Sequence, residues 1–406
     1  NFGEQLREFL SKVQRMVARI KELDIKPRCK LLFSFFQVAA QLTTVYNVKM
    51  TGSSGDLYAD STAVFAWADF DVDGYIYPGQ CVTLGFRVRL LMRAIAPIVL
   101  ILAIPVGRIA FVYGRLAVQK MKDLLGLKKD EHTGPLEVVS TRSPLIDALY
   151  VAVPFALEIS FLLVTMVSKG IFDTWDCSEY ELDGEVRTFL NADLQIVCSG
   201  NDHPEEYDEI RYIAIFFLAL WPIGMPIIYM IVLFPIRALL RQKKSTRWVQ
   251  ATEFLHQDYK PNFFWWEIIT LTQRLVLSGF VKIIPIEADS WRIFLGVLWT
   301  IGYLSLIQYV QPYKNNGLNQ LAVATQFSLV CVFLGGAFIK LFSGDGVDSA
   351  TCDGAAASNA NDDNVLTIVG IMVAFNFSVL VMFVTLAAIQ FTTSSVLPSV
   401  RLVASG

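Results

Sequence analysis

Eight apolar stretches, each nearly long enough to cross a lipid bilayer, constrain this 406-residue chain more than any other feature. A transmembrane helix needs roughly 20 apolar residues to span ~30 Å of hydrocarbon, and lipid offers no hydrogen bonds to an open backbone. The sequence therefore predicts an all-α membrane protein with about eight transmembrane helices. These helices are expected at residues 31–48, 90–112, 145–167, 213–233, 263–283, 293–309, 321–342 and 365–389.

The segments between the apolar stretches define the expected domain organisation. Residues 1–26 place apolar side chains at three- and four-residue intervals, with Lys and Arg mostly off that stripe, which predicts an amphipathic helix on the cytoplasmic interface. Residues 27–392 are expected to form the transmembrane domain, and residues 393–406 a cytoplasmic tail. Stretch 31–48 is itself amphipathic and is expected either in the interface or facing a bundle interior. External loops are expected at residues 49–85, 168–211, 284–292 and 343–364.

Lys and Arg are distributed unevenly between alternate segments, and this predicts the orientation. With the amino-terminal side in the cytoplasm, 23 of the 34 basic residues fall in cytoplasmic segments and 5 in external ones. Since basic residues concentrate on the cytoplasmic side of membrane proteins, both termini are expected there, with acidic loops outside. Arg87, Arg89 and Arg93 fit this topology least well, because they lie at an outer helix end.

The composition excludes several classes of protein. Only 17% of the residues are charged, against about 25% in a soluble domain, and the net charge of -3 gives no nucleic-acid footprint. The chain has three His residues and no CxxC, HExxH, GxGxxG or GxxxxGKS/T pattern. These patterns support zinc, dinucleotide and phosphoryl chemistry, so we expect no enzymatic activity, cofactor, metal site or nucleic-acid partner.

Cysteines give an independent indication of sidedness, because disulfides persist on the oxidising side of a membrane. Cys81, Cys177, Cys198 and Cys352 all fall in expected external segments. Cys177 with Cys198 is the natural local pair and Cys81 with Cys352 the remainder, although sequence alone does not fix the connectivity. External cysteines imply export, yet no initiator Met or signal peptide precedes the chain. A longer extracellular portion and another span are therefore expected upstream of residue 1.

Five charged residues fall within the apolar stretches, where a charge costs several kcal/mol. They are Arg93, Asp147, Glu158, Glu267 and Arg274. Glu267 and Arg274 share a helix face at a spacing of two turns, about 10 Å, which is too far for a direct pair. Each is expected to meet a partner on another helix, Glu158 being the candidate for Arg274. Such residues are either interhelical ion pairs or members of an ion or proton pathway.

Two further features bear on conduction. Prolines are expected to kink the second and fourth helices at Pro97, Pro105, Pro222, Pro226 and Pro235. The loop after the seventh helix contains Asp345 and Asp348 near glycines, which makes these two residues candidates for a pore mouth. A solvated acidic loop that concentrates cations is the alternative.

Five short motifs together resemble a known membrane module. They are residues 30–37 (KLLFSFFQ), 172–177 (FDTWDC), 196–198 (IVC), 259–267 (YKPNFFWWE) and 311–322 (QPYKNNGLNQLA). Similar motifs occur in the polytopic module at the carboxy-terminal end of large algal and protist surface proteins, which is similar to TRP-like and polycystin-like channels. The resemblance implies a TRP-like membrane domain, tetrameric and cation-conducting, with a sensing or anchoring ectodomain.

These observations lead to two functional hypotheses. The first is a TRP-like cation channel subunit of the plasma membrane, gated by external load or ligand, with cations and the lipid bilayer as partners. The second is a non-conducting anchor or receptor that holds an extracellular fibre or the missing ectodomain, on a cell surface, flagellum or cilium. A homo- or hetero-oligomer is compatible with either hypothesis.

Overall fold

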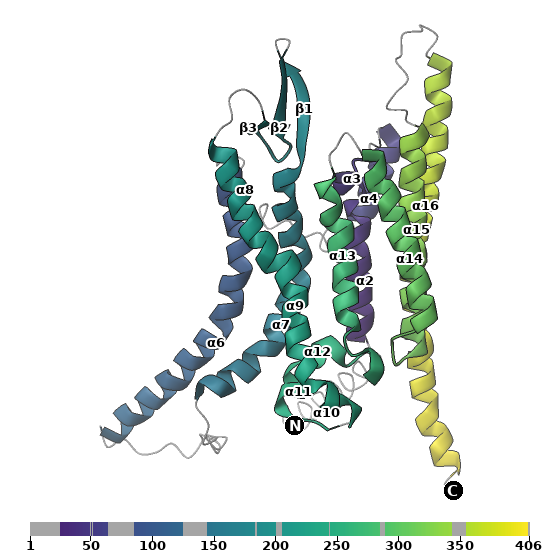
Figure 1. The fold of residues 1–406 in the computed structure, drawn as a ribbon. Coiled ribbons are helices and arrows are strands. Elements are labelled where there is room, and N and C mark those ends of the chain that lie inside the picture. The colour runs from purple at the N-terminus through teal and green to yellow at the C-terminus, as the bar shows by residue number, and fades with distance from the viewer. Residues whose placement is uncertain are drawn as a thin grey trace, which may run out of the picture. The chain divides into compact units, whose positions relative to one another are not determined.

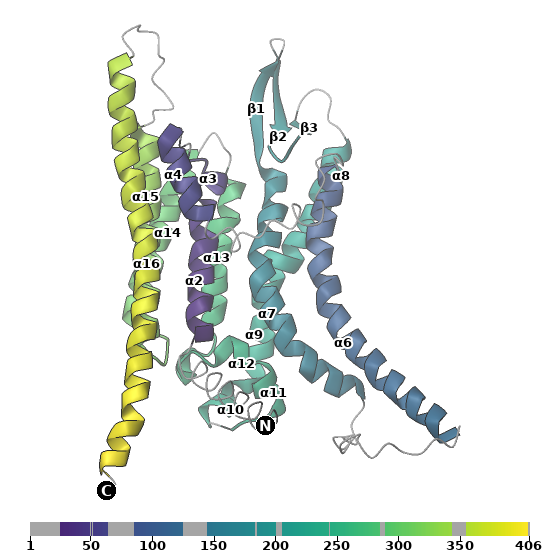
Figure 2. The same ribbon diagram turned by 180° about the vertical axis from the view of Figure 1, so that it is seen from behind.

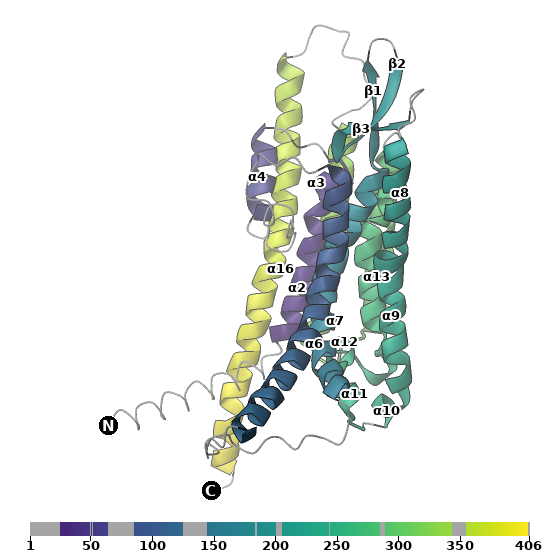
Figure 3. The same ribbon diagram turned by 90° about the vertical axis from the view of Figure 1, so that its left-hand side faces the viewer.

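A computed structural model describes residues 25–48, 50, 52–63, 85–124, 144–182, 185–199, 205–242, 244–284, 289–342 and 355–404. The chain divides into two compact units, which are described separately. Unit 1 combines residues 1–70 with residues 284–406, and unit 2 comprises residues 71–283. Figure 1 shows the helices and strands of both units, and Figures 2 and 3 show them from two other sides.

Unit 2 is built on long helices that run between its two ends (Figure 1). The helices are α6 (Phe86–Leu124), α7 (Pro144–Phe172), α8 (Glu205–Leu218), α9 (Gly224–Leu233) and the shorter α13 (Trp266–Ser278). Helix α7 packs against α6, α8 and α13, and α13 also packs against α9. The core between them contains Leu157 and Val164 of α7, and Leu271 and Leu275 of α13.

One end of unit 2 carries a three-stranded antiparallel sheet, β1 (Cys177–Leu182), β2 (Glu185–Leu190) and β3 (Asp193–Ser199). Residues of β1 and β2 pair from Cys177 opposite Leu190 to Leu182 opposite Glu185, and irregularities interrupt the pairing of β2 with β3. The sheet lies within residues 168–211, which were expected to form a loop. Turn η1 (Asp173–Trp175) joins α7 to β1.

The other end of unit 2 consists of short helices (Figure 1). Turn η3 (Phe234–Ile236) leads into α10 (Arg237–Arg241), which is followed by α11 (Arg247–Ala251), α12 (Glu253–His256) and turn η4 (Pro261–Phe263). Thr246 begins α11, because its hydroxyl accepts a hydrogen bond from the Val249 amide at 3.3 Å. After α13, turn η5 (Phe280–Ile283) returns to the sheet end.

Unit 1 contains α2 (Ile25–Ala39), α3 (Gln41–Val45), α4 (Gly52–Ala63), α14 (Asp289–Val310), α15 (Asn316–Phe342) and the 50-residue α16 (Ala355–Ala404). Helix α15 packs against α14, α16 and α2, and α4 packs against α16. Close approach is possible at Gly336, where an added Cβ would lie 2.9 Å from a Leu42 methyl carbon. Helix α4 lies within the expected loop 49–85, and α16 continues through the expected tail.

The turn between α14 and α15 explains one sequence motif, residues 311–322. Gln311 adopts a positive φ of 45°, which turns the chain sharply at the end of α14. The Asn319 side chain then bonds both backbone groups of Tyr313, at 3.0 Å and 3.1 Å. Asn315 accepts a hydrogen bond from the Gly317 amide at 2.9 Å and so caps α15. The motif therefore specifies a tight helical hairpin.

Within the described residues, six helical segments are long and apolar enough to cross a membrane. They cover Phe86–Arg115, Leu149–Trp175, Glu206–Arg241, Ser290–Val310, Asn316–Leu341 and Asn364–Gln390, and correspond to six of the eight expected spans. The other two fall on helices α2 and α13, which have 15 and 13 residues. The coarse prediction of a helical membrane protein thus agrees with the fold, with the small sheet as an addition.

The prolines affect the helices differently. Helix α6 continues through Pro97 and Pro105. The fourth expected span changes type at Pro222, where η2 (Ala219–Ile223) is a π-helical turn, and again at Pro235 in η3. Pro226 lies in the first turn of α9, where no amide donor is required.

Candidate functional site: two polar clusters in unit 2

The first cluster lies beneath the sheet, where four charged side chains meet. Lys282 of η5 bonds Asp173 of η1, and its Nζ lies 3.9 Å from Asp176 Oδ2. Arg93 of α6 approaches Asp173 Oδ2 at 3.7 Å from the other side. Lys282 has a side-chain exposure of 4%, so its charge is compensated almost entirely by these carboxylates. We call this group the sheet-end charge cluster.

A glycine makes room for this cluster. A Cβ at Gly170 would lie 2.9 Å from Arg93 Nη1. The missing side chain on α7 therefore lets the guanidinium of α6 reach Asp173.

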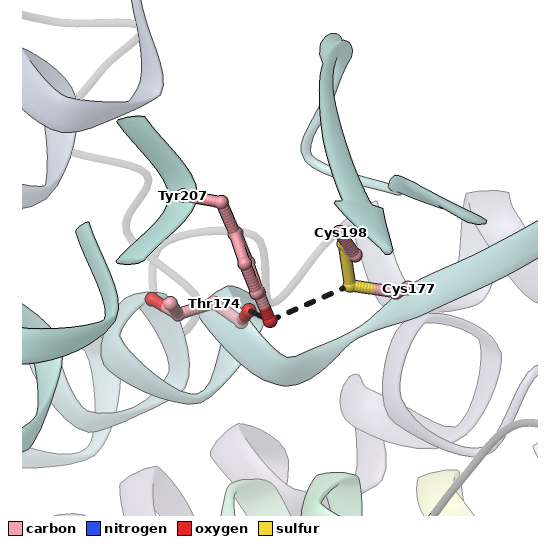
Figure 4. The surroundings of a disulfide bond; sticks show 4 residues. All are labelled: Thr174, Cys177, Cys198 and Tyr207. Carbon is pink, nitrogen blue, oxygen red and sulfur yellow. Dashed lines mark hydrogen bonds between the residues drawn. A yellow bond between two sulfur atoms is a disulfide. The ribbon is translucent and has the colours of Figure 1, made fainter. Parts of the chain in front are cut away.

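A disulfide fixes the sheet beside the cluster (Figure 4). Cys177 at the start of β1 is bonded to Cys198 of β3, which confirms the expected local pair. Tyr207 of α8 donates a hydrogen bond to the Thr174 carbonyl at 3.1 Å, and its hydroxyl lies 3.7 Å from Cys177 Sγ. One tyrosine therefore ties α8 to both η1 and the disulfide.

The three arginines that fit the expected topology least well each have an acidic partner at this end. Arg87 pairs with Glu209 at 2.7 Å, and Arg89 lies 3.5 Å from Asp193. Arg93 meets Asp173 in the sheet-end charge cluster. Asp193 also accepts a hydrogen bond from the Phe86 amide at 3.1 Å, so a β3 carboxylate caps α6.

The second cluster lies between α7, α9 and α13, and we call it the interhelical polar cluster. It contains Ser160, Phe161, Tyr229, Glu267 and Arg274, all of which are buried. Arg274 Nη1 donates to the Phe161 carbonyl at 3.3 Å, and the guanidinium carbon lies 4.1 Å from the centre of the Phe161 ring. The guanidinium thus gains both a hydrogen bond and a cation–π contact from α7.

Glu267 and Tyr229 complete this cluster. Tyr259 donates a 2.7 Å hydrogen bond to Glu267 Oε2 and so closes the η4 turn onto the start of α13. The hydroxyls of Tyr229 and Ser160 lie 2.8 Å apart. Since Ser160 gives its proton to the Leu157 carbonyl, Tyr229 is the donor of this pair. Glu267 and Arg274 both interact electrostatically with Tyr229.

The expected site residues are therefore distributed as follows. Arg93 belongs to the sheet-end charge cluster, and Glu267 and Arg274 belong to the interhelical polar cluster. Glu158 is half-buried on α7, one helical turn before Phe161. Asp147 lies on α7, but its side chain is outside the described part of the structure, as are Cys81, Cys352, Asp345 and Asp348.

Several residues of these clusters were not anticipated. Three of them lie in motifs that carry the resemblance, namely Asp173, Asp176 and Tyr259. The motifs did not predict which residues these side chains contact. Lys282 was counted among the external basic residues, at the end of the expected helix 263–283, and Tyr207, Tyr229 and Ser160 carry no sequence signal of their own. Among the described residues, no group of three or more His, Cys, Asp and Glu is placed to hold a metal ion. The chemistry that the two clusters offer is charge compensation and hydrogen bonding between helices.

The fold and its buried charges define a helical membrane protein. No family model matches the chain, and no solved structure gives a significant match. The chain is 21% identical over 166 residues to cysteine repeat modular protein A of Toxoplasma gondii. This similarity covers 40% of the chain and 5% of that protein, so the chain spans only a small part of the relative's length.

Proposed function

We propose that the chain is an eight-span membrane domain in which α2–α3 and α13–η5 cross the bilayer together with the six long helices. Lengths support this: α13 and η5 together rise about 28 Å, close to the ~30 Å hydrocarbon layer. The basic α10 segment and the disulfide lie at opposite ends of unit 2, which supports a cytoplasmic α10 and an external sheet.

We further propose that this domain acts as a TRP-like cation channel subunit, or as a channel-derived domain, gated through its external end by load or ligand. The observation that carries the proposal is the burial of Glu267 and Arg274 on one short helix, with exposures of 0% and 1%. Charges are rare within membrane spans, and they commonly mark ion pathways or elements that move between two paired states. The plasma membrane, including that of a flagellum, is the proposed location.

Single-channel recording of the purified full chain in planar bilayers tests conduction. We expect a cation current under stretch, voltage or a calcium gradient, and a changed open probability or conductance in Glu267→Gln. Arg211→Gln is the matched control, because it removes an exposed charge of α8 and should leave the current unchanged. A folded protein that passes no current under any of the three stimuli would contradict the proposal.

A second candidate is a non-conducting anchor or receptor for an extracellular fibre or ectodomain. It is favoured by the similarity to a far longer protein whose name refers to cysteine repeats. The subunit number, measured by native mass spectrometry, distinguishes the two candidates. A tetramer that conducts favours the channel, whereas a silent monomer favours the anchor.

A further inference from the structure

The end of unit 2 opposite the sheet carries an exposed basic surface that neither polar cluster uses. Arg237, Arg241 and Lys244 are all exposed, and we call them, together with Phe234, the α10 basic patch. Arg237 and Arg241 are four residues apart and therefore share one face of α10. The sequence has no Asp or Glu between Glu209 and Glu253 that could compensate these charges.

The patch directly continues an exposed apolar stripe. Ile227, Ile231 and Phe234 follow one another at four- and three-residue intervals and are 52%, 65% and 54% exposed. Arg237 comes three residues later, and its guanidinium carbon lies 4.3 Å from the centre of the Phe234 ring. One surface stripe thus changes from apolar to basic within a single turn, near the end of the membrane-spanning segment Glu206–Arg241.

The basic segment is held in place by its surroundings. The Trp248 indole of α11 donates to the Val232 carbonyl at 3.4 Å, and its ring packs against Tyr150 of α7 at 6.0 Å. The Lys244 amide donates to the Leu239 carbonyl at 3.0 Å, which folds the chain back after α10. The patch is therefore a preformed surface, and binding there requires little ordering of the backbone.

Helix α6 repeats the same arrangement. Its segment Phe86–Arg115 is apolar, and at its end the Arg115 guanidinium carbon lies 4.6 Å from the centre of the exposed Phe111 ring. An Arg stacked on an aromatic side chain at the end of a span presents its charge at the depth of the lipid headgroups.

We propose that the α10 basic patch binds the headgroup of an anionic phospholipid, with the acyl chains along the Ile227–Ile231–Phe234 stripe. The basic groups complement the phosphate and carboxylate of such a headgroup, and the apolar stripe complements its tails. The inference requires only that the helices span a membrane. It depends neither on ion conduction nor on the orientation of the chain.

Titration of the full chain in mild detergent with dioctanoyl-phosphatidylserine, followed by native mass spectrometry, tests this inference. Each basic residue near an anionic headgroup contributes about fivefold in affinity. The triple variant R237Q/R241Q/K244Q should therefore bind this lipid at least about tenfold more weakly, with binding of dioctanoyl-phosphatidylcholine unchanged. The variant R87Q/R187Q/R211Q removes the same charge at the sheet end and should bind phosphatidylserine as the wild type does.

Three results would overturn the inference. They are full phosphatidylserine affinity in the patch variant, an equal loss in the control variant, or displacement of the lipid by inorganic phosphate at equal concentration. If the triple variant does not fold, the wild type and R241Q replace it. Wild-type affinity for phosphatidylserine should then fall steeply between 50 and 500 mM salt, roughly as the Debye length shortens, and R241Q should bind about fivefold more weakly. An affinity that is unchanged in both measurements would equally contradict the inference.

Discussion

Arg274 shows how a charged side chain is accommodated among apolar helices. Its guanidinium lies against the face of the Phe161 ring and donates to the carbonyl of the same residue. Both contacts come from α7, 113 positions earlier in the sequence. Arg274 therefore connects α13 to α7, and its removal should loosen the contact between these helices.

Replacing Arg274 tests this connection. We expect Arg274→Ala to lower the free energy of unfolding by about 2–4 kcal/mol, because it removes both contacts and leaves a cavity. Arg274→Lys keeps the charge but loses the planar group and should cost about 1–2 kcal/mol. Unfolding in mixed detergent micelles, followed by circular dichroism, measures both values. Arg211→Ala, an exposed control, should stay within about 0.5 kcal/mol of the wild type; equal stability of all variants would contradict the argument.

The identity of a buried charge was predictable from sequence, whereas its contacts with an aromatic ring and a backbone carbonyl were not. Glu267 and Arg274 stand out because a charge in an apolar stretch is costly. The expected pairing of Arg274 with Glu158 stays a prediction, whereas its contacts with Phe161, one turn further along α7, were not expected. A π-face and a backbone carbonyl leave no mark in a sequence, so charge pattern alone cannot reveal them.

At the scale of elements, close approach depends on glycines that accommodate a neighbouring ring. Gly279 ends α13, and an added Cβ there would lie 2.3 Å from Phe172 Cδ2 at the end of α7. Gly302 of α14 has no heavy atom within 4 Å of the same position. The two glycines therefore form a matched pair for testing helix packing.

Alanine substitution at these two glycines should change the free energy of unfolding differently. Gly279→Ala forces Phe172 out of position, and we expect a loss of about 1–3 kcal/mol in unfolding free energy. Gly302→Ala is expected to be neutral or to stabilise by up to about 1 kcal/mol, because alanine favours the helix. Thermal unfolding in detergent compares the variants. Equal shifts in both would show that the α13–α7 contact is looser than the structure indicates.

The disulfide is expected to stabilise the three-stranded sheet. Cys177 and Cys198 are separated by 21 positions, and closing a loop of this length contributes about 3 kcal/mol. The double variant C177S/C198S should therefore lose hydrogen-exchange protection in β1–β3 while α7 stays protected. Cys29→Ser, which removes a free thiol, is the control. Unchanged protection in the sheet would show that Tyr207 and the β pairing hold it without the disulfide.

The apolar helices were predictable as elements, but the sheet was missed. A run of roughly 20 apolar residues admits few alternatives in lipid, so six long apolar helices followed directly from the sequence. The sheet segment is polar and charged, and it was read as a solvated loop. Its signals were Asp183-Gly184 between two short runs, and the Val, Thr and Phe residues of β2. Membrane-scale hydropathy does not detect six-residue strands.

At the scale of the whole molecule, the proposed topology places the sheet and the α10 segment on opposite sides of the membrane. Cysteines introduced one at a time by Arg187→Cys and Ser245→Cys test this in a variant without Cys29, Cys81, Cys331 and Cys352. A membrane-impermeant maleimide should label position 187 in intact cells, and position 245 only after permeabilisation. The reverse pattern would show that the topology is inverted. Labelling of both positions in intact cells would show that no membrane separates them.

The sheet-end charge cluster has a structural consequence. Lys282 lies in η5, four residues after α13 ends at Ser278, and it is bonded to the turn that begins the sheet, so one ammonium group links the sheet end to the segment that follows α13. The disulfide joins β1 to β3 at the end of β1 that follows this turn. Through η5 and α13 this link continues to Arg274 on the Phe161 ring, so one short stretch of chain joins the two polar clusters of unit 2.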